Sequence, residues 1–204
     1  MRFKLITTLC ACLVILGLVV TQAKATTWDL NTSNENLGIS GNFATVDIGV
    51  NDKTATFTIA ANLDIFTPGS NFGIDKFFFN TTLSGITAGD FIVADGWTVK
   101  TSQNASSFGD FEFLYKGTGD SRINPLNFSI TDSSITSALD FYDANSSGFH
   151  FVAHIAGFSD LNGNTSAFFG DGAPGAPVPE PGTIVLLGAG LLGLGLFGRK
   201  RMKG

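Results

Sequence analysis

The sequence predicts an all-β fold, an antiparallel β-sandwich of the jelly-roll type, followed by a single C-terminal transmembrane helix. The first reason is composition: the 204 residues include 20 Phe and 25 Gly, and only 14% are charged. Aromatic residues and turn formers suit strands better than helices. The second reason is that short segments alternate apolar and polar side chains, whereas no middle segment keeps a helical period. Many short strands at regular spacing are typical of a sandwich.

The clearest strand pair in the sequence is a predicted hairpin. Residues 44–50 and 54–60 alternate in polarity and flank the turn-forming residues 51–53. Residues 134–141 suit one short turn of helix. Further strands are expected at residues 76–80, 91–94, 97–100, 111–116, 126–131 and 148–157. Together these segments form a predicted ectodomain at residues 26–172.

The first 25 residues have the three parts of a secretory signal peptide. A short basic region is followed by the apolar residues 5–20, and Ala23-Lys24-Ala25 supplies the small residues of a cleavage site. We therefore expect export through the Sec translocon and cleavage by signal peptidase, with Thr26 as the mature start. An uncleaved anchor is one alternative. A lipoprotein signal at Cys12 is another, disfavoured because most of the apolar run follows this cysteine.

The composition of the mature chain narrows the possible functions. Both cysteines, Cys10 and Cys12, lie in the signal peptide, so a structural disulfide, a thiolate metal site and a cysteine nucleophile are excluded. Residues 26–178 carry sixteen acidic and five basic side chains, a net charge of −11. Such a domain repels nucleic acid and anionic membrane surfaces, which argues against nucleic-acid functions.

The C-terminal end has three parts in a fixed order. Residues 173–182 contain four prolines, which keep a linker extended. Residues 183–198 carry no charge, and as a helix they would span about 24 Å against a hydrocarbon core of about 30 Å. This predicts a marginal transmembrane helix, with the tail at residues 199–204 on the cytoplasmic side. The basic residues of the tail are Arg199, Lys200, Arg201 and Lys203.

This three-part tail resembles a PEP-CTERM sorting signal. The resemblance spans residues 178–204 and begins with Val178, Pro179, Glu180 and Pro181. It implies a transient hold in the inner membrane and cleavage near Pro179-Glu180-Pro181 by an exosortase, a membrane-embedded cysteine transpeptidase-like enzyme. It also implies delivery to the cell surface or extracellular matrix of a Gram-negative bacterium that makes exopolysaccharide. The same motif is sometimes labelled an ice-binding protein C-terminal domain, but that label describes the tail and is no evidence of ice binding.

A second, looser resemblance concerns the end of the ectodomain. Phe151-Val152-Ala153-His154, a Gly/Asn/Ser-rich loop at residues 163–166 and Phe168 are similar to the late strand, loop and aromatic residue of many PEP-CTERM ectodomains. Those ectodomains resemble β-sandwiches, which agrees with the strand pattern. The similarity carries no activity with it.

His150 and His154 are the only histidines. On the strand that their neighbours indicate, they would face the same way but lie about 13 Å apart, too far to share one metal ion. We therefore expect a structural role for each.

A partial calcium loop is the one candidate metal site. Asp160, Asn162 and Asn164 place oxygen atoms at alternate positions, and Asp171 is the twelfth residue. However, Thr165 stands where the sharp turn needs glycine, and Asp171 is shorter than the usual bidentate Glu. An Asn-rich turn is therefore favoured, and calcium is the only cofactor for which the sequence gives any signal.

The remaining patterns are weaker. Thr54, Thr56 and Thr58 share a strand face, but one strand is not the array that ice or sugar binding would need. Asp110 and Glu112 also share a face, and a carboxylate pair alone is weak evidence for acid–base catalysis. The sequence contains no nucleophile elbow, phosphate loop or zinc-protease motif.

These observations predict an exported, exosortase-processed surface or matrix protein that is not an enzyme and associates with exopolysaccharide. The alternative is a carbohydrate-binding or adhesive β-sandwich, with calcium as a structural ion. A secreted hydrolase is a third, less favoured hypothesis.

Overall fold

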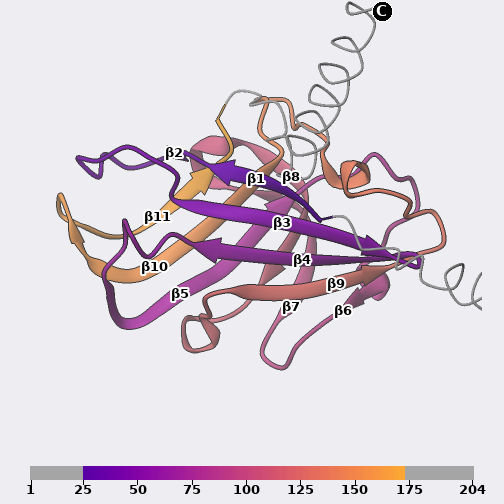
Figure 1. Cartoon of the computed structure of the whole chain (residues 1–204), viewed down its shortest axis with the longest axis horizontal. Coiled ribbons are helices and arrows are strands. Elements are labelled where there is room, and N and C mark those ends of the chain that lie inside the picture. Colours follow the sequence, from indigo (N-terminus) through magenta and orange to yellow (C-terminus); the bar gives the residue numbers. More distant parts are fainter. Residues whose placement is uncertain (1–24, 173–204) are drawn as a thin grey trace, which may run out of the picture.

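The computed structural model describes residues 25–172, which form two antiparallel sheets packed face to face (Figure 1). The predicted all-β sandwich is confirmed. The strands are β1 (Ala25–Leu30), β2 (Thr32–Ser33), β3 (Ala44–Asn51), β4 (Thr54–Ala61), β5 (Pro68–Phe79), β6 (Phe91–Ile92), β7 (Thr98–Asn104), β8 (Asp110–Lys116), β9 (Leu126–Thr131), β10 (Phe151–Leu161) and β11 (Asn164–Gly170).

Helical structure in the described part is limited to four short 3₁₀ turns. They are η2 (Ala88–Asp90), η3 (Ser106–Phe108), η4 (Gly119–Ser121) and η5 (Ala138–Phe141). The last of these lies within residues 134–141, where one helical turn was predicted. No helix between residues 25 and 172 is long and apolar enough to cross a membrane. The transmembrane helix predicted at residues 183–198 lies outside the described residues.

Sheet A has the strand order β1-β3-β4-β9-β6. At its centre is the predicted hairpin of β3 and β4, paired from Ala44↔Ala61 to Asn51↔Thr54. Asp52 and Lys53 form the turn with φ angles of 43° and 65°, the left-handed backbone that a tight two-residue hairpin turn requires. The predicted turn residues therefore fix the register that turns Phe57 and its apolar neighbours inward.

Sheet B has the strand order β2-β11-β10-β5-β8-β7. Its central strand β10 pairs with β11 on one side and with β5 on the other. The turn between β10 and β11 lies at one end of the long axis of the sandwich, on the left in Figure 1. Alternation along β10 sends Phe151, Ala153 and Ile155 into the main core, while Val152 joins a smaller apolar cluster on the other face of the sheet.

Aromatic side chains fill the space between the sheets. Phe57 is fully buried and stacks on Phe128 with the ring centroids 4.6 Å apart and the planes 9° from parallel. Its ring also lies 5.2 Å from Phe79 and 5.1 Å from Phe141. Such packed aromatic pairs contribute beyond the area they bury. The high Phe content of the sequence thus builds one continuous core.

Three strands were absent from the sequence-based prediction, and one predicted loop is wrong. β1 and β2 precede the first predicted strand, and β11 covers most of residues 163–166, which were expected to be a loop. Ser166 pairs with Ala156 of β10, so backbone hydrogen bonds to a neighbouring strand override the turn preference of a Gly/Asn/Ser-rich segment. β5 begins at Pro68, eight residues earlier than expected.

Candidate functional site

The pairing of β10 is interrupted on both sides at the same level of sheet B. On one side, the pairs Ala156↔Ser166 and Leu161↔Asn164 are five residues apart along β10 but only two apart along β11, so β10 contains extra residues there. On the other side, the pairs Ala156↔Gly73 and Phe158↔Pro68 are two residues apart along β10 but five apart along β5, so the extra residues belong to β5. Extra residues of this kind bend a strand and re-aim its side chains, and they are over-represented beside functional sites.

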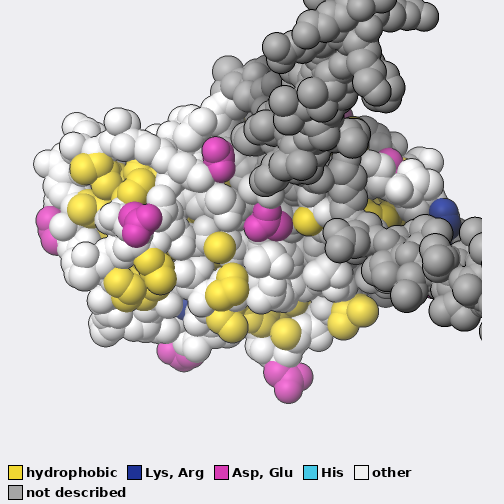
Figure 2. Space-filling view, in the orientation of Figure 1, with side chains coloured by type: hydrophobic (Ala, Val, Ile, Leu, Met, Phe, Trp, Pro, Cys, Tyr) yellow, Lys and Arg dark blue, Asp and Glu magenta, His cyan; other side chains and the backbone are white. Residues whose placement is uncertain are grey.

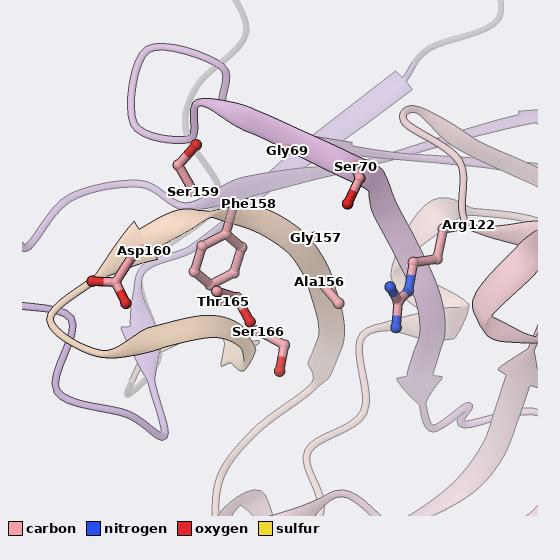
Figure 3. A pocket seen from close by; sticks show the side chains of 10 residues that line it. All are labelled: Gly69, Ser70, Arg122, Ala156, Gly157, Phe158, Ser159, Asp160, Thr165 and Ser166. Carbon is pink, nitrogen blue, oxygen red and sulfur yellow. The ribbon is translucent and has the colours of Figure 1, made fainter.

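A pocket of about 440 Å³ lies over this irregular stretch, which we call the β10 bulge (Ala156–Leu161). Its size falls within the range of small-molecule sites, about 300–1,000 Å³. Figure 3 shows that its wall combines β5, β10, β11 and the segment after η4. The lining residues are Gly69, Ser70, Arg122, Ala156, Gly157, Phe158, Ser159, Asp160, Thr165 and Ser166.

Polar groups dominate the side chains of the pocket. Ser70, Ser159, Thr165 and Ser166 bring hydroxyls that both donate and accept hydrogen bonds. Arg122, which only donates, and the Asp160 carboxylate, which only accepts, lie on opposite sides of the view in Figure 3. The Asp160 Oδ1 atom already accepts a bond of 3.0 Å from the Gly163 amide, which holds this carboxylate at the hairpin.

Gly157 allows β5 to approach the bulge closely. Its φ is +77°, and a Cβ atom at this position would lie 2.4 Å from the Asn71 carbonyl oxygen. Both the left-handed backbone and the contact therefore require glycine. The bulge depends on this residue, because no flexible side chain is available to move aside.

We expect Gly157→Ala to lower the free energy of unfolding by about 1–3 kcal/mol, because strain and the clash with Asn71 must be relieved by moving backbone. Equilibrium urea unfolding, followed by the fluorescence of Trp28 and Trp97, measures this loss. Gly163→Ala is the matched control: its φ is +87°, but a Cβ atom there meets nothing within 4 Å. Equal losses in both variants would contradict a role for the close backbone approach.

A buried carboxylate, Asp75, contacts Arg122 of the pocket lining. It is the extra residue of a second bulge, since Ile74 pairs with Ile155 and Lys76 with His154. Asp75 is 5% exposed, and its Oδ2 atom accepts from Arg122 Nε at 3.0 Å. Its Oδ1 atom lies 2.6 Å from His154 Nδ1.

The charges around Asp75 determine its protonation. Burial raises the pKa of Asp75, but the hydrogen bond and charge of His154, followed by Arg122 and Lys76, lower it further than burial raises it. The net result is a pKa below the ordinary value of 3.8, so the carboxylate is ionised at neutral pH. It therefore holds Arg122 as a charged pair at the pocket wall.

A second buried carboxylate, Asp171, directly follows β11 and lies near the start of β10. Its Oδ1 atom accepts from the backbone amides of His150 and Phe151, and Oδ2 lies 2.7 Å from His150 Nδ1. Tyr142 stacks on the His150 ring at 3.6 Å. Burial raises the pKa of Asp171 above its ordinary value, although these hydrogen bonds and the His150 charge oppose the shift.

The two histidines contact different carboxylates: His150 Nδ1 contacts Asp171, and His154 Nδ1 contacts Asp75.

The four residues of the candidate calcium loop do not lie together. Asp160, Asn162 and Asn164 surround the turn between β10 and β11, whereas Asp171 follows the far end of β11, roughly 20 Å along the strand. Among residues 25–172, no group of three or more His, Cys, Asp or Glu side chains could hold a metal ion.

The threonine row on β4 extends across sheet A. The Thr58 hydroxyl donates to Asn127 Oδ1 at 2.8 Å, and Ser129 donates to Thr56 at 3.4 Å. Thr54 and Thr131 are likewise bonded, at 3.0 Å. These side chains bond to one another across β4 and β9, and such cross-strand pairs stabilise a sheet.

The carboxylates noted on β8 have separate partners. Asp110 accepts a hydrogen bond from Asn104, and Glu112 accepts one from the Thr81 amide. Asp75 and Arg122, which are central to the pocket, were not singled out from the sequence. The available signal was weak: Asp75 and Lys76 are two charges between apolar residues, and Arg122 is one of only five basic residues in the acidic domain.

The residues expected to direct export and sorting fall almost entirely outside the described part of the chain. They include Ala23, the motif from Val178 to Pro181 and the basic cluster from Arg199 to Lys203. Ala25 is described, and it is the first residue of β1.

Comparison with known proteins gives one match, and it falls on the tail. Residues 177–201 match the family model of the PEP-CTERM protein-sorting motif. No curated protein matches the chain. No solved structure matches it either.

Proposed function

We propose that this protein, which carries a PEP-CTERM sorting motif at residues 177–201, is a non-enzymatic surface or matrix protein associated with exopolysaccharide. The motif is the observation that carries the proposal, because it marks an exported protein that an exosortase sorts. In this scheme the tail holds the chain in the membrane only until processing, and the β-sandwich is the part that remains outside.

The chemistry of the described domain supports a binding or structural role. Its histidines and buried carboxylates form two separate pairs, which tie strand β10 to β5 and to the end of β11. Acidic side chains are scattered over the face in Figure 2, where few basic ones appear. A strongly acidic surface favours solubility in a hydrated matrix over contact with anionic membranes.

Replacing Pro179, Glu180 and Pro181 together by alanine is expected to block processing. The full-length precursor should then accumulate in the membrane fraction, and surface protein should fall, because the processing enzyme loses its recognition sequence. Immunoblots of fractionated cells with an antibody against the sandwich measure both. Ala173→Ser, outside the matched residues, is the control. Recovery of the triple variant at the surface, in the processed size, would contradict the proposal, as would full-length protein in the cytosol.

A carbohydrate-binding β-sandwich is the second candidate function. The pocket over the β10 bulge favours it, because residues from β5, β10, β11 and the segment after η4 line it with donors, acceptors and hydroxyls. Saturable binding of a glycan to the purified protein would favour this candidate over a purely structural matrix role.

A further inference from the structure

We propose that the pocket over the β10 bulge binds a sugar unit of a neutral polysaccharide. The inference rests on the proposed association with exopolysaccharide and assigns that association to one site. It follows from the chemistry of the lining, the fixed position of Arg122 and the charge of the domain.

The lining matches the hydrogen-bonding pattern of a sugar. Arg122 only donates, the Asp160 carboxylate only accepts, and the four hydroxyls do both. A ligand with several hydroxyl groups carries both the donors and the acceptors that such a lining requires. An anionic ligand would be repelled by the Asp160 carboxylate, whereas the hydroxyls of a neutral polyol can both donate to and accept from the lining.

The donor at the pocket wall is held in place before any ligand arrives. Arg122 Nε bonds to Asp75, and Nη1 lies 3.5 Å from the Asn71 carbonyl oxygen. The neighbouring Ile123 exchanges both backbone hydrogen bonds with Ile74, at 2.9 and 3.2 Å. The Arg122 side chain is 24% exposed and lines the pocket. A fixed donor loses little conformational entropy on binding.

Charge argues against an acidic polysaccharide. Residues 25–172 carry sixteen acidic and five basic side chains, and Asp75 offsets the charge of Arg122 itself. A polyuronate or sulfated chain approaching the pocket would be repelled by the field of the whole domain. A neutral chain experiences no such repulsion.

The test uses full-length protein purified in detergent and the exopolysaccharide of the producing cells, separated by anion exchange into a neutral and an acidic fraction. We expect saturable binding to oligosaccharides of the neutral fraction by isothermal titration calorimetry. Ser166→Trp should weaken this binding at least about tenfold by filling the pocket from an exposed strand position. Thr56→Trp, on an exposed position of sheet A, is the matched control and should bind normally.

Arg122→Lys gives a second readout, since it keeps the charge but loses the fork of donors. It should weaken binding, with the thermal unfolding midpoint recorded to show that the domain is folded. Binding confined to the acidic fraction, no binding to either fraction, or equal affinity in Ser166→Trp and Thr56→Trp would overturn the inference. If Ser166→Trp still co-purifies with exopolysaccharide from cells, the pocket assignment fails while the proposed function stands. If wild-type protein is not associated with exopolysaccharide at all, the proposed function fails.

Discussion

Phe57→Ala is expected to lower the free energy of unfolding by about 3–5 kcal/mol, the usual effect of deleting a fully buried phenylalanine. Phe57 has no exposed surface, and its ring contacts Phe128, Phe79 and Phe141. These rings come from β9, β5 and η5, so the loss would be felt in both sheets. Because the free energy of unfolding of a domain is only about 5–15 kcal/mol, we expect a large fraction of the variant molecules to be unfolded at 37 °C.

Urea unfolding followed by tryptophan fluorescence measures this effect, because both tryptophans, Trp28 and Trp97, are buried in the core. Phe57→Leu keeps most of the volume and should lose less. Thr56→Ala, one residue away on the exposed face of β4, should change stability by no more than about 0.5 kcal/mol. A small effect of Phe57→Ala would mean that the aromatic cluster is not the centre of the fold.

The regular strands of the sandwich are predictable because their sequence alternates. The β3–β4 hairpin follows from residues 44–60, where apolar and polar side chains alternate around the tight turn at Asp52 and Lys53. β9 occupies the predicted residues 126–131. In these strands one face is buried and the other is solvated, so the alternation of apolar and polar residues along the sequence predicts the strand directly.

The irregular strands cannot be predicted from the sequence, because their residues do not alternate in polarity. β11 contains Asn164 and Ser166, whose local preference is for turns, and pairing with β10 makes them part of a strand. The early part of β5 contains Pro68, Gly69 and Gly73, which break the alternation. Bulges depend on which strand lies alongside, and a single segment holds no information about its neighbour.

The candidate pocket is hidden by the same long-range pairing. Arg122 lies 47 residues after Asp75 in the sequence, and their contact depends on the bridge between Ile74 and Ile123. His154 was expected to be structural, but its carboxylate partner could not be identified before β5 and β10 were paired. The sorting motif at residues 177–201 differs from the pocket, because it is a local sequence pattern that can be recognised without knowledge of the fold.

Asp75→Asn is expected to lower the free energy of unfolding by about 3 kcal/mol at pH 7, the low end of the effect of breaking a buried ion pair. The side chains of Arg122 and Lys76 keep 24% and 28% of their area exposed, so water offsets part of the lost charge. His154 Nδ1 would face a neutral amide in place of a carboxylate. Urea unfolding at pH 7 measures the loss, and an unchanged stability would show that Asp75 does not hold this region together.

The pH dependence of the same variant tests the cause. Because the folded pKa of Asp75 lies below 3.8, its contribution is complete above that pH and is lost as the pH falls through the folded value. Asp171 acts in the opposite direction: its raised pKa means that its contribution is lost as the pH rises above 3.8 through the folded value. The stability difference between wild type and Asp75→Asn should therefore shrink on acidification, whereas Asp171→Asn should gain relative to wild type as the pH rises. Parallel pH profiles in the two variants would contradict these opposite roles of Asp75 and Asp171.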